Sequence, residues 1–225
     1  MFPRSVKIQG EQRVHLGNSD LYFKRVSSSV IEVYFKTRNY SEIIARLNYN
    51  ENIELIIEPR PLGFNSEYKC IVYKFREPLT ILPKTRSELK LDLPYSLAII
   101  TNNTVVSTIE PMKRKIALYG PPTIGDLCIY YREGDLDQLY WPTGELVVTI
   151  VNTTNKPYTI IRLVIPTSGL SIYTTNERVL YGKVRAEIEE HLGKFTIKVL
   201  TTREPIEESA MPVYISESVQ YVMGF

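Results

Sequence analysis

The sequence feature that most constrains this fold is a succession of short segments in which apolar and polar residues alternate. Clear examples lie at 29–36, 52–58 and 68–75, and each ends near a proline, glycine or asparagine. Alternation with a period of two places successive side chains on opposite faces of an extended strand. The pattern therefore predicts half-buried strands separated by tight turns.

The short gaps between these segments favour antiparallel pairing. Between residues 77 and 110 four further runs are broken only by Pro83, Pro94 and the pair Asn102-Asn103. Parallel strands in a doubly wound sheet need crossovers of about a dozen or more residues, usually helical. Alanine is scarce while the chain holds 16 tyrosines, which suits sheet rather than helix. We predict an all-β antiparallel β-sandwich.

Two segments could form either a helix or a strand, so at most one or two short helices are expected. Residues 183–193 show apolar spacing of four but also strand-like alternation, and Phe195, Ile197 and Val199 alternate directly beyond Gly193. A hairpin would bury both sets together, so we favour strands there. Residues 41–47 are the other candidate for a short helix.

The chain length allows one large core or two small ones. With 225 residues, we expect two sandwich-like halves, 1–112 and 113–225, meeting near residue 112. One extended sandwich is the alternative.

Charge and hydropathy narrow the partners and the cellular location that we expect for this protein. The net charge is only +2, far from the strongly basic balance that would itself indicate nucleic acid. No apolar leader precedes Lys7 and no run approaches the roughly 18 apolar residues of a membrane span. We expect a cytoplasmic protein without a transmembrane segment, and its composition resembles that of thermophile proteins.

Catalytic and metal motifs do not appear. His15, His191, Cys70 and Cys128 are scattered without the spacing of a zinc site, so no metal and no cofactor are expected. Both cysteines lie in apolar runs, which predicts buried free thiols, since a disulfide would be unusual in a cytosol except in a thermophile. Nucleophile-elbow and phosphate-loop patterns are absent from the sequence. We therefore expect a protein that is not an enzyme.

An acidic loop at 133–138 could instead bind a hard cation. Glu133, Asp135 and Asp137 alternate there, and Asp126 could join them. Such loops are usually solvated, so a metal-dependent hydrolase ranks third among the functions considered.

A basic cluster supports the second-ranked function. Lys113, Arg114 and Lys115 stand between upstream basic residues and downstream tyrosines, a combination that single-stranded nucleic acid uses. The alternative is that these cations form the solvent face of a strand while the aromatic rings fill the core.

The segment 115–132 (KIALYGPPTIGDLCIYYR), with Val151-Asn152-Thr153 and 162–166, resembles an archaeal family catalogued only as a domain of unknown function. That family often carries a basic residue where Ile129 stands here, and it brings no established activity. Its members occur beside mechanosensitive-type channels, so the resemblance implies a membrane-associated partner, peripheral to a channel.

The first-ranked function is a non-enzymatic binding or assembly module of an archaeal-type cell. Edge strands and tyrosine-rich faces would mediate binding to a protein partner or self-association. The rigid turn at 119–122 and its surroundings are the predicted binding surface, since loops held by a sheet commonly carry function. The predicted binding residues are Tyr119, Gly120, Pro121, Tyr130, Arg132 and Trp141.

Overall fold

The computed structural model describes residues 4–49, 53–64, 66–113, 115–120 and 125–224. Most of them are strand, and the only helical element in these ranges is a 3-10 turn, η1 (Asp135–Gln138). The all-β prediction is confirmed. The helix considered at 41–47 is wrong, because these residues form a strand that pairs with its neighbour along its length.

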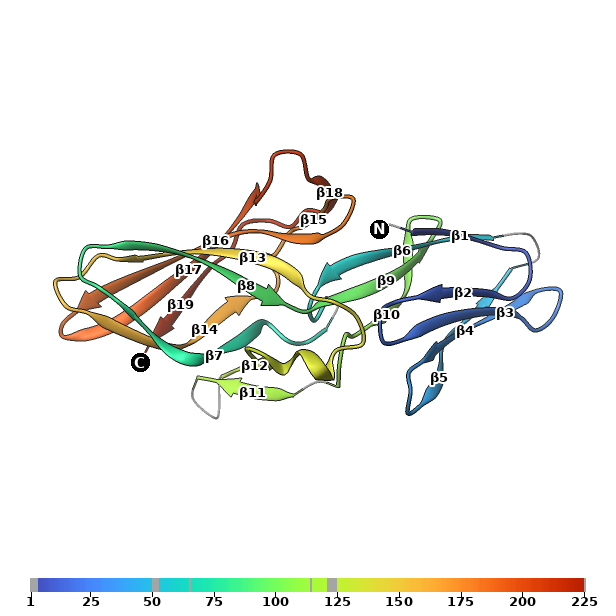
Figure 1. Cartoon of the computed structure of the whole chain (residues 1–225), viewed down its shortest axis with the longest axis horizontal. Coiled ribbons are helices and arrows are strands. Elements are labelled where there is room, and N and C mark those ends of the chain that lie inside the picture. The colour runs from blue at the N-terminus through green and yellow to red at the C-terminus, as the bar shows by residue number, and fades with distance from the viewer. Residues whose placement is uncertain (1–3, 50–52, 65, 114, 121–124, 225) are drawn as a thin grey trace.

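Two four-stranded antiparallel sheets form the N-terminal sandwich-like unit, on the right in Figure 1. The first has the order β1-β6-β9-β10 and the second the order β2-β3-β4-β5. The first contains β1 (Arg4–Ile8), β6 (Ile53–Pro61), β9 (Tyr95–Thr101) and β10 (Thr104–Ile109). The second contains β2 (Gln12–His15), β3 (Asp20–Arg25), β4 (Val30–Lys36) and β5 (Ser41–Asn48).

Two mixed sheets form the C-terminal unit. Sheet C has the order β11-β12-β7-β14. Sheet D runs β18-β15-β16-β13-β8, with β17 paired to β16 and β19 paired to β17. Sheet C contains β11 (Ile116–Tyr119), β12 (Asp126–Arg132), β7 (Cys70–Ile81) and β14 (Tyr158–Pro166). Sheet D contains β8 (Arg86–Leu93), β13 (Gly144–Asn152), β15 (Ile172–Thr174), β16 (Val179–His191), β17 (Lys194–Pro205), β18 (Met211–Tyr214) and β19 (Gln220–Gly224).

Two strand pairs are parallel, β7 with β12 and β13 with β16. Between β7 and β12 the chain visits β9 and β10 of the N-terminal unit, so strands rather than a helix make the connection. β7 and β8 precede residue 112 but pair with strands that follow it. A domain boundary near residue 112 stays a prediction.

The hairpin favoured at 183–199 is present. β16 and β17 pair antiparallel from Gly182 to the closing pair His191 and Lys194. Ile188, Ile197 and Val199 are fully buried, so the alternation buries both sets of side chains together as the sequence predicts.

The junction between the two units is lined with aromatic and arginine side chains. The Trp141 indole N–H donates to the Tyr95 carbonyl at 3.0 Å, and only 2% of Trp141 is exposed. The Arg60 guanidinium lies 5.0 Å from the centre of the Tyr214 ring and donates to the Val213 carbonyl at 3.3 Å. These contacts join the N-terminal unit to sheet D and to the segment that precedes β13.

The prediction of free thiols is wrong, because Cys70 and Cys128 form a buried disulfide. The two residues stand directly opposite each other on the parallel strands β7 and β12, with their Cα atoms 4.6 Å apart. They are 58 residues apart in the chain, so only the strand register brings them together.

Candidate functional site: a basic groove on sheet C

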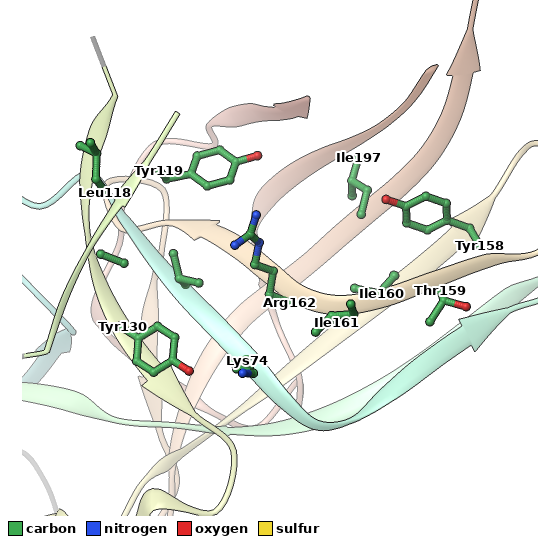
Figure 2. Close-up of a pocket in the computed structure, with 12 residues that line it drawn as sticks. Lys74, Leu118, Tyr119, Tyr130, Tyr158, Thr159, Ile160, Ile161, Arg162 and Ile197 are labelled. Atoms are coloured by element: carbon green, nitrogen blue, oxygen red, sulfur yellow. The ribbon is translucent and has the colours of Figure 1, made fainter. Parts of the chain in front are cut away.

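An open groove of about 680 Å3 lies over one face of sheet C. All four strands of the sheet contribute to it, and β17 of sheet D adds one side chain, Ile197. Figure 2 shows Arg162 in the middle, with its guanidinium directed toward Tyr119 and the Tyr158 hydroxyl pointing inward from the other side.

Three cationic residues stand in register across the sheet beside this groove. Arg132 of β12 is paired with Lys74 of β7, and Lys74 is paired with Arg162 of β14. Directly paired residues point to the same face of a sheet. All three are exposed, and no described carboxylate makes an ion pair with any of them. We call Arg132, Lys74 and Arg162 the basic row.

Strand alternation explains why the basic row faces outward. The residues next to its members in sequence, Tyr73, Tyr131 and Leu163, are at most 1% exposed and form the core on the other face of sheet C. Like charges directly opposite each other destabilise a sheet. The fold therefore tolerates a local repulsion that an anion lying across the row would relieve.

Apolar side chains form the floor and part of the rim. Val72 and Ile160 are 4% and 2% exposed, whereas Leu118 and Ile161 at the rim are 48% and 56% exposed. The groove can therefore remove an apolar group from water beside a cluster of positive charge.

Three half-buried tyrosines, Tyr119, Tyr130 and Tyr158, complete the lining. Burial raises the pKa of Tyr119 and of Tyr158, and the positive charge of Arg162 partly opposes this shift at both residues. Both phenols therefore keep their protons at neutral pH and can donate hydrogen bonds to an anion.

The structure brings some of the predicted binding residues together. Tyr119 and Tyr130 line the groove and Arg132 belongs to the basic row. Gly120 directly follows β11 and has a φ of +107°, a conformation that glycine adopts readily. Pro121 lies outside the described residues, and Trp141 is buried at the junction away from this groove.

Sequence reasoning missed Lys74, Arg162 and Tyr158. Each interrupts or flanks an apolar run, but nothing in the chain indicates that β7 and β14 are neighbours. Ile129, where the similar family often has a basic residue, is fully buried and is not among the residues that line the groove.

The acidic loop makes separate contacts instead of one cluster. Asp135 pairs with Lys115 at 3.1 Å, and a Glu133 carboxylate oxygen accepts the Arg76 backbone N–H at 2.8 Å. Asp126 contacts the Lys69 ammonium at 3.2 Å and accepts the Tyr221 hydroxyl at 2.8 Å. Within the described residues no three His, Cys, Asp or Glu side chains gather as a metal site.

The basic cluster at 113–115 does not contribute to the groove. Lys113 lines a separate hollow beside Tyr40 and Tyr140, and Lys115 is paired with Asp135. Arg114 lies outside the described residues.

The fold and groove define an all-β protein with sandwich-like packing of its sheets and an open, cationic and partly apolar surface groove. The chain belongs to the family described as "Protein of unknown function (DUF432)", whose model matches residues 4–221. No curated protein and no solved structure matches it significantly. In the part of the chain that the structure describes, no helix has the length and apolar character needed to cross a membrane.

Proposed function

We propose that this protein is a non-enzymatic binding module whose groove on sheet C takes an anionic ligand with an apolar portion. The observation that carries the proposal is the basic row, three exposed cations in register with no described carboxylate partner. The buried floor at Val72 and Ile160 supplies the apolar contact.

The arrangement suits binding more than chemistry. Tyr119 and Tyr158 keep their protons, and no imidazole or thiol is among the described residues that line the groove. An anionic head group placed across Lys74 and Arg162 would receive charge-assisted hydrogen bonds, each worth about 1.5–3 kcal/mol. The attached apolar chain would lie over Ile160 and Ile161.

Titration calorimetry with three probes tests the proposal, and the decyl probes are kept at concentrations at which they do not aggregate. Decyl phosphate should bind, whereas decanol and inorganic phosphate, which each offer half of the recognition, should bind at least about tenfold more weakly. Arg162→Gln should weaken decyl phosphate binding by about ten- to a hundredfold, since it removes one charge-assisted contact. Lys113→Gln, an exposed lysine outside the groove, is the matched control. Equal affinities for decanol and decyl phosphate would refute a role for the basic row.

A second candidate is single-stranded nucleic acid, favoured by the tyrosines that stand beside the cations. Base stacking on an aromatic ring contributes about 1–3 kcal/mol per base, and phosphate contacts make the affinity depend steeply on salt. A fluorescent oligonucleotide titrated at several salt concentrations tests it. Loss of affinity in Tyr130→Ala and Arg132→Gln would favour nucleic acid. Loss only in the double variant Lys113→Ala and Lys115→Ala would move the site away from the groove.

A further inference from the structure

Three turns meet at the end of the C-terminal unit that is farthest from the N-terminal sheets, on the left in Figure 1. They connect β7 to β8 (82–85), β13 to β14 (153–157) and β16 to β17 (192–193). Hydrogen bonds join the first turn to the end of β13 and the central turn to β16. The Asn152 backbone N–H donates to the Thr85 carbonyl at 2.9 Å, and the Thr153 N–H donates to the Ile188 carbonyl at 3.0 Å.

Two leucines at this end are directed into solvent. Leu192 is 90% exposed and Leu82 is 61% exposed, the two largest exposures among the large hydrophobic side chains of the described residues. They lie on two different turns. The turn at 82–85 contacts the central turn at 153–157 through Lys84, and the central turn contacts β16, the strand that leads to Leu192, through Ile188.

Leu192 also has an unfavourable backbone conformation. It occupies a two-residue turn closed by His191 and Lys194, with φ of +51° at Leu192 and +77° at Gly193. Such turns favour Asn-Gly, because a positive φ is costly for a bulky side chain. Folding alone therefore gives no reason for leucine here, while contact with an apolar partner does.

The charge around the leucines is positive. The segments 82–85, 153–157 and 191–194 contain Lys84, Lys156 and Lys194 and no carboxylate. Lys156 pairs with Glu190 at 2.7 Å, and the Lys84 ammonium donates to the Thr153 carbonyl at 2.6 Å. Lys84 also has a positive φ of 55°.

We propose that these three turns form a docking surface for an anionic lipid bilayer, with Leu82 and Leu192 inserting at the interface and the lysines contacting the head groups. The two leucines stand on separate turns and present far less than the roughly 800 Å2 that each partner buries in a stable protein interface. Insertion into a bilayer needs no such continuous area, and lysine stems can lie along the apolar boundary while their ammonium groups reach phosphates.

Flotation of the full chain with vesicles tests the proposal. One set is phosphatidylcholine alone and the other contains added phosphatidylglycerol. The protein should float with the anionic vesicles and less with the neutral ones, and the difference should shrink as salt rises. Leu192→Asn should reduce partitioning by at least about tenfold, since it removes an inserting side chain.

The choice of asparagine separates binding from folding. Asparagine tolerates a positive φ, so the melting temperature of Leu192→Asn should equal or exceed that of the wild type. Val26→Ser is the matched control, an exposed apolar residue that follows β3 in the N-terminal unit, and its partitioning should be unchanged.

Three results would overturn the proposal. One is no flotation with either vesicle, another is unchanged flotation of Leu192→Asn, and the third is a change in oligomeric state in place of lipid binding, which would assign the surface to a second copy. The turns share no residue with the groove. Arg162→Gln should therefore float normally whether or not the groove proposal holds.

Discussion

Replacing Asn152 by alanine should destabilise the C-terminal unit substantially, because this fully buried side chain makes four hydrogen bonds. Its amide nitrogen donates to the carbonyls of Ile81 and Lys156 at 3.1 and 2.9 Å. Its amide oxygen accepts from the backbone N–H and the hydroxyl of Thr154 at 3.0 and 2.8 Å. One side chain thus holds the central turn and ties it to the end of β7.

Each such bond contributes about 1 kcal/mol net, which gives about 4 kcal/mol for the four. Water can reach the exposed Lys156 and satisfy part of the loss, so we expect a decrease of about 3 kcal/mol in the free energy of unfolding. For a chain of this size that corresponds to a melting temperature lower by about 6–12 °C.

Urea denaturation followed by circular dichroism measures this change. Asn155→Ala, an exposed residue of the same turn, should alter stability by less than about 0.5 kcal/mol. A loss below about 1 kcal/mol in Asn152→Ala would show that the network does not hold the turns together.

Two further predictions concern the interior of sheet C. The disulfide closes a loop of 58 residues, so the Cys70→Ala, Cys128→Ala double variant should lose about 4 kcal/mol by the chain-entropy estimate, measured by urea denaturation against the oxidised wild type; an unchanged midpoint would contradict it. The buried Tyr131 hydroxyl has no hydrogen-bond partner among the described residues, so Tyr131→Phe should keep or raise stability by about 1 kcal/mol. Burial raises the pKa of Tyr131 from 10.0 to about 12. Ionisation of this phenol therefore leaves the folding stability unchanged below pH 10 and lowers it as the pH rises toward 12, because the unfolded chain loses the proton first. Thermal melts across this range should show a smaller decline in the melting temperature of Tyr131→Phe than of the wild type.

The sequence predicted the strands well because their signal is local. Alternation at 183–199 identified the β16–β17 hairpin, since each strand buries every second side chain regardless of its partner. The alternation at 41–47 is weaker and did not distinguish a strand from a helix. The reason is that β5 is an edge strand with mostly exposed or half-buried residues and so lacks a clear buried face.

The candidate site was only partly predictable. Tyr119, Tyr130 and Arg132 lie close together in the sequence, so a local argument about the turn at 119–122 could select them. Lys74 and Arg162 come from β7 and β14, which are distant in the chain and meet only through strand pairing.

By itself the sequence determined the fold class and, for the strands with clear alternation, which face is buried, because both follow from the period of side chains along an extended backbone. Only the tertiary structure decided which strands are neighbours and in which register. That pairing opposed Cys70 to Cys128, aligned the basic row and gathered the three turns at one end. The physical reason is that backbone hydrogen bonds are almost the same for any strand pair, so partner and register are chosen by the packing of the whole core.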